Sequence, residues 1–349
     1  MTAAVHVPPQ VPRVTDALGR PLRSLRLSVT DRCNLRCNYC MPEPDYAWLP
    51  KDALLTVEEL VGVASLFVES GVDRIRVTGG EPLLRPDLPE LVGRLSRLSG
   101  VRDLALTTNG VLLEAQAQAL FSAGLHRVTV SLDTLRPERF LKLTRRDLHG
   151  RVLAGIQAAR SSPGGLKLDA VVMRGFNDDE LGELIEYGKA VSAEVRFIEY
   201  MDVGGATHWS PEKVVSGAEI LSRLGRRYGT PRPAPTPPSA PATRYALSDG
   251  TVFGVIASVT TPFCRSCDRS RLTADGTWYH CLYAARGRSL RERLRAGTPR
   301  EEMRRLLQTD WAARRDRGAE ARAALTQRSP LPTEALRRDV RLEMHARGG

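Results

Sequence analysis

The chain has 349 residues, a formal net charge of +11 at pH 7, 42% hydrophobic residues and 26% charged residues. This length predicts two domains or one large barrel with an appendage. No apolar run approaches the roughly 20 residues that a membrane span needs, which excludes a membrane protein. The start shows no basic patch followed by an apolar stretch, so we expect no secretory signal and a cytoplasmic location.

The excess positive charge is concentrated near the C-terminus. Residues 286–349 hold 17 Arg against nine Asp or Glu, so +8 of the excess lies in the last 64 residues. A basic segment can bind a polyanion, but a solvated helical face is the more common explanation. Aromatic residues make up only 5% of the chain, too few for the stacking platforms of single-strand binders. We expect no membrane and no nucleic acid as partner, and we interpret most of the Arg-rich stretch as solvated surface.

Short β-branched runs alternate with amphipathic stretches after an N-terminal arm of residues 1–20. The predicted strands are 24–29, 73–77, 102–107, 127–131, 166–172 and 194–199. The predicted helices are 56–70, 86–98, 112–123, 152–160 and 178–190. The first of these begins at Thr56 with Glu59 three residues on, as in a capping box. Six β/α units predict parallel strands joined by crossover helices.

A compact polar group follows each predicted strand. The groups are Thr30-Asp31-Arg32, Thr78-Gly79-Gly80-Glu81, Thr107-Thr108-Asn109, Ser131-Leu132-Asp133, Met173-Arg174-Gly175 and Tyr200-Met201-Asp202. Barrel enzymes carry their active sites at the C-terminal ends of the strands, so six such groups favour one shared site at the mouth of the barrel. Any single group could instead simply form a turn. The predicted fold is α/β, a partial (β/α)6 TIM-type barrel over residues 21–228.

The chain beyond residue 228 changes character. Residues 229–244 contain six prolines and little that could pack, which predicts a linker or a surface loop. Residues 245–258 have the pattern of a hairpin around Ser248-Asp249-Gly250. A C-terminal region over 245–349 completes the chain and ends in Gly348-Gly349.

The six cysteines form two triplets with none left over. Cys33, Cys37 and Cys40 have the spacing C-x3-C-x2-C, and Cys264, Cys267 and Cys281 have the spacing C-x2-C-x13-C. Structural zinc sites are closed by four ligands, whereas each triplet is one ligand short. A [4Fe–4S] cluster held by three cysteines keeps one iron open to a non-protein ligand. Iron–sulfur clusters are therefore favoured, with zinc and a disulfide framework as alternatives.

Two motifs carry a resemblance to a known superfamily. Cys33-Asn34-Leu35-Arg36-Cys37-Asn38-Tyr39-Cys40 directly follows the first predicted strand, and Gly79-Gly80-Glu81-Pro82 follows the second. With this pair the chain resembles the radical S-adenosylmethionine superfamily. There the cysteine motif binds a [4Fe–4S] cluster whose open iron chelates the methionine part of S-adenosylmethionine, and the glycine motif holds the amino group of that cofactor.

Further strings narrow the resemblance, which runs from about residue 18 to the C-terminus. Together these strings make the chain similar to the GTP 3′,8-cyclase family of molybdenum cofactor biosynthesis. They are LRLSVTDRCNLRCNYCMP, RVTGGEPLLR, LALTTNG, RVTVSLDTL, FIEYMDVG, PFCRSCDRSRLTADG and the terminal Gly-Gly. The resemblance implies a lyase that converts GTP to (8S)-3′,8-cyclo-7,8-dihydroguanosine 5′-triphosphate through a 5′-deoxyadenosyl radical. It also implies two [4Fe–4S] clusters and S-adenosylmethionine as cofactors.

The resemblance assigns roles to single residues. The first cluster would be held by Cys33, Cys37 and Cys40, and the second, where the family binds guanine, by Cys264, Cys267 and Cys281. The S-adenosylmethionine contacts would be Tyr39, Gly80, Ser131 and Met201. The GTP contacts would be Arg26, Arg76, Thr107, Lys167, Arg269 and Arg271. The catalytic group would be Cys33, Cys37, Cys40, Arg269, Arg271, Gly348 and Gly349, with the terminal glycines reaching into the barrel.

Arg26, Arg76 and Lys167 alternate with apolar residues inside predicted strands. A triphosphate needs several fixed cations, which explains inward-facing basic residues. Because a buried cation without a partner is costly, the alternative is pairing with a buried acid such as Glu81 or Glu199.

Two positions depart from the family pattern: Asp268 stands where Asn is common, and Ser270 replaces an apolar residue between Arg269 and Arg271. From the resemblance we expect a flavodoxin- or ferredoxin-type electron donor and a separate cyclic pyranopterin monophosphate synthase that uses the product. A homodimer is a further family expectation. The alternatives are another two-cluster radical enzyme and a non-enzymatic iron–sulfur electron carrier.

Overall fold

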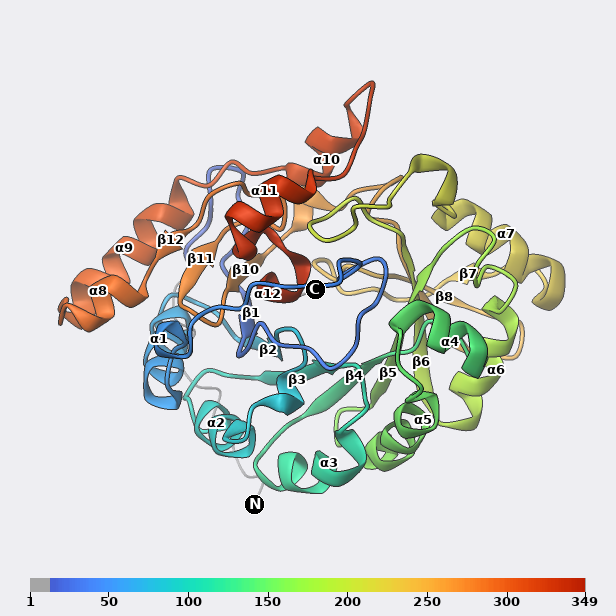
Figure 1. The fold of residues 1–349 in the computed structure, drawn as a ribbon, viewed down its shortest axis with the longest axis horizontal. Coiled ribbons are helices and arrows are strands. Elements are labelled where there is room, and N and C mark those ends of the chain that lie inside the picture. Colours follow the sequence, from blue (N-terminus) through green and yellow to red (C-terminus); the bar gives the residue numbers. More distant parts are fainter. Residues whose placement is uncertain (1–12, 349) are drawn as a thin grey trace, which may run out of the picture.

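The computed structural model describes residues 13–348, so most of the N-terminal arm and the predicted site residue Gly349 lie outside the described residues. One twelve-stranded sheet has the order β12-β11-β10-β1-β2-β3-β4-β5-β6-β9-β8-β7. Its two edge strands do not pair with each other, so the sheet is open. The sheet curves around a central space with helices α1 to α7 on its outer side (Figure 1). The predicted α/β class is confirmed.

The strands fall into a parallel centre and two antiparallel edges. The parallel strands are β10 (Arg269–Leu272), β1 (Ser24–Ser28), β2 (Arg74–Thr78), β3 (Asp103–Thr108), β4 (Arg127–Ser131), β5 (Leu166–Val172), β6 (Ala193–Glu199) and β9 (Val252–Ile256). The edge strands are β11 (Thr277–Tyr279) and β12 (Arg288–Ser289) on one side and β8 (Thr243–Ala246) and β7 (Arg232–Pro233) on the other.

The helices are α1 (Val57–Glu69), α2 (Leu88–Ser96), α3 (Leu113–Ser122), α4 (Pro137–Thr144), α5 (His149–Ala158), α6 (Leu181–Ala190), α7 (Gly217–Tyr228), α8 (Arg291–Arg295), α9 (Arg300–Ala312), α10 (Gly318–Ala323), α11 (Thr333–Arg338) and α12 (Met344–Arg347). The predicted capping box forms at the start of α1, where the side chains of Thr56 and Glu59 bond each other's backbone N–H. Helices α4 and α7 were not predicted, and no ranges were predicted for the C-terminal helices α8 to α12. None of the helices within residues 13–348 could cross a membrane.

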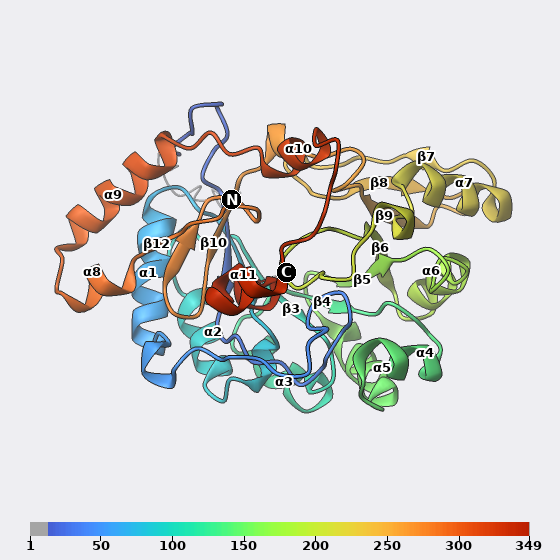
Figure 2. The same ribbon diagram turned by 45° about the horizontal axis from the view of Figure 1, so that its top comes forward.

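The chain after β6 adds one parallel strand to each side of the first six. β9 pairs with β6, and β10 pairs with β1. The predicted hairpin is confirmed, since β8 and β9 are antiparallel and Gly250 lies in the turn between them. Helices α8 and α9 lie beside α1, whereas α11 and α12 lie over the mouth of the curved sheet (Figures 1 and 2).

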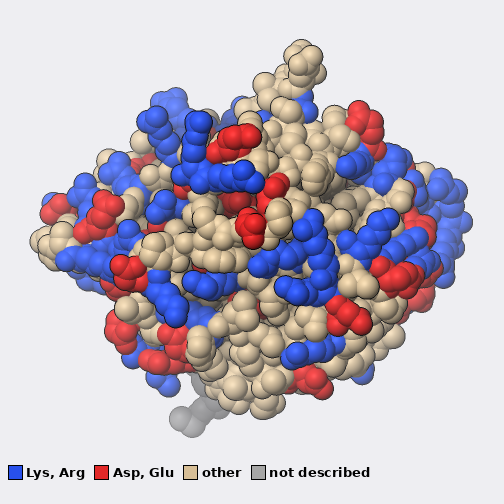
Figure 3. Space-filling model, viewed as in Figure 1, with Lys and Arg blue, Asp and Glu red and all other residues tan. Residues whose placement is uncertain are grey.

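Most arginines of the Arg-rich stretch are exposed or half-buried, as the interpretation from composition expected, but at least four of them make internal contacts. Arg314 and Arg347 are buried. Arg322 and Arg328 both form ion pairs with Asp202, whose side chain is fully buried. On the visible face, basic and acidic side chains are interspersed (Figure 3). These four arginines therefore act inside the protein, where they hold the C-terminal segment in place.

Candidate active site

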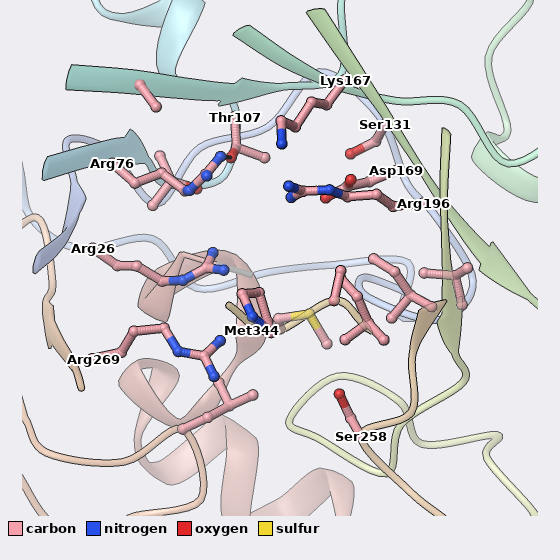
Figure 4. A pocket seen from close by; sticks show the side chains of 18 of the residues that line it. Arg26, Arg76, Thr107, Ser131, Lys167, Asp169, Arg196, Ser258, Arg269 and Met344 are labelled. Atoms are coloured by element: carbon pink, nitrogen blue, oxygen red, sulfur yellow. Dashed lines mark hydrogen bonds between the residues drawn. The ribbon is translucent and has the colours of Figure 1, made fainter. Parts of the chain in front are cut away.

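A cavity of about 630 Å³ lies inside the curve of the sheet (Figure 4). Nine Lys or Arg and six Asp or Glu line it, so its wall is net basic. Thirteen predicted site residues line it: Arg26, Cys33, Cys37, Tyr39, Cys40, Arg76, Gly80, Thr107, Ser131, Lys167, Met201, Arg269 and Arg271. Cys264, Cys267 and Cys281 do not line it, but each is next in sequence to a residue that does.

The first cysteine triplet lies on the loop that leaves the carboxyl end of β1. The backbone N–H groups of Arg36 and Asn38 donate to carbonyls at the end of α4, over 2.9 and 3.1 Å. The Arg36 guanidinium folds back and donates to the carbonyl of Cys33 at 2.9 Å. The unpredicted helix α4 therefore fixes the shape of the cysteine loop.

The Gly79-Gly80 pair lies directly against this loop. Gly80 N–H donates to the carbonyl of Thr30 at 2.9 Å, and Glu81 N–H donates to that of Arg32 at 2.8 Å. A Cβ at Gly80 would lie 2.3 Å from the Arg32 carbonyl oxygen. Any larger side chain would push the two loops apart, which explains why the two motifs occur together.

The predicted S-adenosylmethionine contacts come from four different strand ends. Tyr39 follows β1, Gly80 follows β2, Ser131 ends β4 and Met201 follows β6. The Tyr39 hydroxyl donates to Asp133 Oδ2 at 2.8 Å, and burial raises the pKa of Asp133 to about 6. The shared mouth predicted from the polar groups is thus present.

The second triplet lies beside the start of β10 and the end of β11. Cys264 Sγ accepts hydrogen bonds from the backbone N–H groups of Ala319 and Glu320 in α10. Cys267 Sγ lies 3.7 Å from Arg314 Nη2. Although burial opposes ionisation of Cys267, the Arg269 and Arg314 guanidinium groups lower its pKa to about 7. The C-terminal helix α10 and Arg314 therefore complete the surroundings of these thiols.

The two departures from the family pattern have structural partners. Asp268 forms an ion pair with Arg74 at the start of β2. Ser270 Oγ accepts a hydrogen bond from the indole N–H of Trp278 on β11. Both side chains are buried, so each polar substitution is matched by a partner that satisfies it.

One group of cavity cations has no carboxylate partner among residues 13–348: Arg76, Arg269 and Arg271. Arg76 donates to the hydroxyls of Thr107 and Thr129 at 3.0 and 3.1 Å. Burial and the neighbouring Arg269 lower the pKa of Arg271 to about 9. We call these three residues the central cations. Guanidinium groups without a carboxylate partner fit an anionic ligand.

Arg26 belongs to the same level. It is the register partner of both Arg76 and Arg271 on the adjacent strands. Burial, followed by the charge of Arg271, lowers its pKa. Figure 4 shows Arg26, Arg76 and Arg269 pointing into the same space.

A second group of cations is paired with acids. Glu194 accepts from Lys167 at 3.2 Å and from Arg196 at 2.9 Å, and it lies 3.1 Å from Arg244. Arg127 pairs with Asp103 and Arg74 with Asp268. We call these five residues, Arg74, Arg127, Lys167, Arg196 and Arg244, the paired cations. Arg74, Arg127 and Lys167 lie at or next to the starts of their strands, Arg196 lies in the middle of β6, and Arg244 belongs to β8, outside the first six strands.

The suggested partners Glu81 and Glu199 are wrong. Glu81 accepts from Thr108 Oγ1 and from the N–H groups of Leu83 and Asn109. Glu199 accepts from the N–H groups of Gly217 and Val259, both at 2.7 Å. Both acids therefore hold loops at the carboxyl ends of strands instead of neutralising a cation.

The C-terminal segment reaches into the cavity. Met344 and His345 line it. The Gly348 carbonyl accepts hydrogen bonds from Arg271 and, at 3.5 Å, from Arg26. Gly348 has φ +69°, and a Cβ there would lie 2.2 Å from Thr78 Cγ2. The backbone N–H of His345 bonds the thiol of Cys40, so this segment joins β10 to the first cysteine loop.

Sequence reasoning missed several charged residues that line the cavity: Arg74, Asp103, Arg127, Asp169, Glu194, Arg196 and Arg244. The signal was present in the strands, because Arg74 alternates with Arg76, Lys167 with Asp169, and Glu194 with Arg196. A period of two places both members of each pair on one face of the sheet. Asp169 is notable because its buried Oδ1 has no hydrogen-bond partner among the described residues.

The donor chemistry of both triplets fits iron–sulfur clusters. All six cysteines are free thiols. Within residues 13–348, no group of three or more His, Cys, Asp or Glu is arranged to hold a single metal ion. A cubane cluster differs from a single ion because its thiolates bind separate irons, so a set of three thiols suits it and leaves the fourth iron open.

Two family models match the chain. Residues 27–188 match the Radical SAM superfamily, and residues 193–320 match Molybdenum Cofactor Synthesis C. The fold agrees with the first match. Streptococcus suis SuiB bound to S-adenosylmethionine aligns with a TM-score of 0.61 at 13% identity, over 87% of this chain and 69% of that chain. The class of protein is therefore a radical S-adenosylmethionine fold joined to a molybdenum cofactor synthesis C region.

Curated relatives cover nearly the whole chain. "GTP 3′,8-cyclase 1" of Mycobacterium tuberculosis (strain H37Rv) is 55% identical over 343 residues, which is 97% of this chain and 96% of that protein. "GTP 3′,8-cyclase" of Aquifex aeolicus is 43% identical over 96% of this chain and 99% of that protein. The chain therefore belongs to the GTP 3′,8-cyclase family of the radical S-adenosylmethionine superfamily.

Proposed function

We propose that the chain converts GTP to (8S)-3′,8-cyclo-7,8-dihydroguanosine 5′-triphosphate, the first step of molybdenum cofactor biosynthesis. The observation that carries the proposal is one cavity lined both by the first cysteine loop and by the central cations, which have no carboxylate partner among residues 13–348. This chemistry needs a radical initiator and a bound polyanion within one enclosed space, and full-length relatives named GTP 3′,8-cyclase support the assignment.

Two [4Fe–4S] clusters and S-adenosylmethionine complete the proposed site. The first cluster would be held by Cys33, Cys37 and Cys40, and the second by Cys264, Cys267 and Cys281. When bound, the first cluster with S-adenosylmethionine supplies the 5′-deoxyadenosyl radical that takes a hydrogen atom from GTP. Tyr39, Gly80, Ser131 and Met201 would hold S-adenosylmethionine at the strand ends.

The arginines orient the nucleotide. The central cations and Arg26 would bind the phosphates, with Lys167 and Thr107 as further contacts, because guanidinium groups match phosphate oxygens in a bidentate geometry. Arg271 also donates to the carbonyl of Gly348, so the position of Gly348 depends on the same guanidinium that would meet the substrate. The sheet wall and the C-terminal segment exclude water around the reacting atoms.

The test is anaerobic reconstitution followed by dithionite, S-adenosylmethionine and each nucleoside triphosphate in turn. We expect about eight irons per chain and 5′-deoxyadenosine formation that depends on GTP and is absent with ATP. Nucleotide-independent turnover, or about four irons per chain, would contradict the proposal.

A Cys281→Ser variant separates the two triplets. It should keep about four irons and lose the GTP-dependent reaction. Ser266→Ala, on the same stretch of chain but outside the predicted ligands, is the matched control and should behave as the unaltered protein. Full activity of Cys281→Ser would show that the second site is misplaced.

The remaining expectations concern partners and location. The proposed reaction requires an electron donor of the flavodoxin or ferredoxin type, and its product would pass to a separate cyclic pyranopterin monophosphate synthase. A cytoplasmic location and a homodimer are part of the same proposal.

A further inference from the structure

The Pro-rich segment 234–242 closes one end of the cavity. Its residues Pro237, Ser239, Ala240, Pro241 and Ala242 line the cavity wall. The sequence interpretation as a linker or surface loop is therefore incomplete, because part of the segment faces the site.

The segment crosses the end of the sheet where the parallel strands begin. Ser239 Oγ accepts a hydrogen bond from Arg74 Nη2 at the start of β2, at 2.8 Å. On the other side, Ala242 packs on β9, since a Cβ added at Gly254 would lie 3.0 Å from the Ala242 Cβ. Four strands separate β2 from β9 in the sheet, so the segment spans the opening between the two sides of the curve.

The segment is held in one shape. The N–H of Ala234 donates to the carbonyl of Arg244, and the N–H of Arg244 donates to Thr236 Oγ1, both at 2.9 Å. The Arg244 guanidinium donates to the Pro235 carbonyl at 3.2 Å and pairs with Glu194. Proline fixes its own backbone φ and lowers the freedom that such a crossing must lose. The segment is therefore a formed cap on the cavity.

The capped end offers little to an additional phosphate group. The cavity-lining residues of the cap are Pro, Ala and one Ser, without a basic side chain. The cations beside it already have acid partners: Arg74 pairs with Asp268, Arg127 pairs with Asp103, and Lys167 and Arg196 share Glu194. A phosphate at this level would meet the apolar wall of the cap and would have to compete with these carboxylates for the cations.

We propose that segment 234–242 sets the length of phosphate chain that the cavity accepts, and so excludes nucleotides extended beyond the γ-phosphate. This inference rests on the proposed function and adds a specificity determinant to it. The central cations hold the triphosphate, and the cap with its paired cations forms the wall against which the γ-phosphate ends.

The experiment compares equilibrium binding of GTP and guanosine 5′-tetraphosphate to the reconstituted holoenzyme with S-adenosylmethionine present. In the unaltered protein the tetraphosphate should bind at least about tenfold more weakly than GTP, as expected for a closed polar pocket. In a shortened variant, Asn-Gly replaces residues 236–242, a turn that the flanking β7 and β8 register accepts. There the two affinities should agree within about threefold.

The matched control is Pro238→Ala, at an exposed residue that does not line the cavity; it should keep the discrimination. Equal binding of GTP and tetraphosphate by the unaltered protein would overturn the proposal, and so would undiminished discrimination in the shortened variant. Failure of the unaltered protein to prefer GTP over ATP would instead count against the proposed function, so the two failures are distinguishable.

A second variant covers the case in which the shortened protein does not fold. Ala240→Trp places a large side chain at the capped end and should weaken GTP binding about tenfold, while binding of S-adenosylmethionine stays unchanged. Unchanged GTP affinity in this variant would also overturn the proposal.

Discussion

Two groups of cavity cations carry the same charge and meet different partners. The paired cations have Asp103, Glu194 or Asp268 beside them. The central cations contact threonine hydroxyls, an aromatic ring or a backbone carbonyl instead. Because an acid partner satisfies a buried cation inside the protein, the paired group supports the wall, whereas the central group has only neutral partners among residues 13–348 and is the group that we propose to bind an external anion.

Arg271→Met is expected to have the largest effect. Arg271 is buried and donates to the carbonyls of Arg347 and Gly348, so its loss would remove a proposed phosphate contact and the support of Gly348 together. GTP-dependent formation of 5′-deoxyadenosine should fall on the order of 100-fold. Initial rates with saturating S-adenosylmethionine measure this, and a variant within twofold of the unaltered protein would remove Arg271 from the site.

Arg76→Met should have the second-largest effect, a loss of GTP affinity. Its two threonine contacts show a guanidinium held in place without neutralisation, so the expected loss is about tenfold in GTP affinity. Arg76→Lys should recover part of this loss because it restores the charge but not the bidentate geometry. Titration of GTP into the holoenzyme measures the affinity of both variants. Unchanged affinity in Arg76→Met would show that the central cations do not bind GTP more strongly than the paired cations do.

Lys167 is one of the paired cations and is also a proposed GTP contact, so we expect GTP affinity to depend on pH through its titration. Burial and the charge of Arg196 lower its pKa to about 8, despite the opposing effect of Glu194. Its positive charge is therefore present below that pH and lost as the pH rises through it. GTP affinity should fall by up to about tenfold between about pH 7 and about pH 9, the limit for one proton.

Lys167→Arg is the control for this pH dependence, because arginine keeps its charge over the same range. Its GTP affinity should be flatter with pH than that of the unaltered protein. An identical pH profile in the two proteins would assign the titration to another group.

Arg127→Met should have the smallest effect on GTP. Arg127 pairs with Asp103, and the variant leaves that carboxylate without its partner. The free energy of unfolding should fall by about 1–2 kcal/mol, while GTP affinity changes by no more than about twofold. Denaturant unfolding measures the change in stability, and GTP titration measures the change in affinity. A loss of GTP affinity as large as that of Arg76→Met would show that paired and central cations do not differ in their contribution to GTP binding.

Much of the fold followed from patterns of short range. The alternation of the strands and the capping box of the first helix depend on neighbouring residues, and all six predicted strands and five predicted helices are present. Helix α4 was missed because its buried side is formed by few apolar residues, with Phe140 and Leu143 at its centre. The internal contacts of Arg322 and Arg328 were missed because their partner Asp202 lies far away in the sequence.

The sequence by itself determined the chemistry that the chain offers: two cysteine triplets, the Gly79-Gly80 turn and inward arginines on alternating strand positions. Only the tertiary structure decided which of those cations are neutralised and where the Pro-rich segment lies. Arg74 meets Asp268 across 194 positions and Ser239 across 165. Such contacts arise from the register of the sheet and the path of a connection over its end, and no local pattern of residues encodes either one.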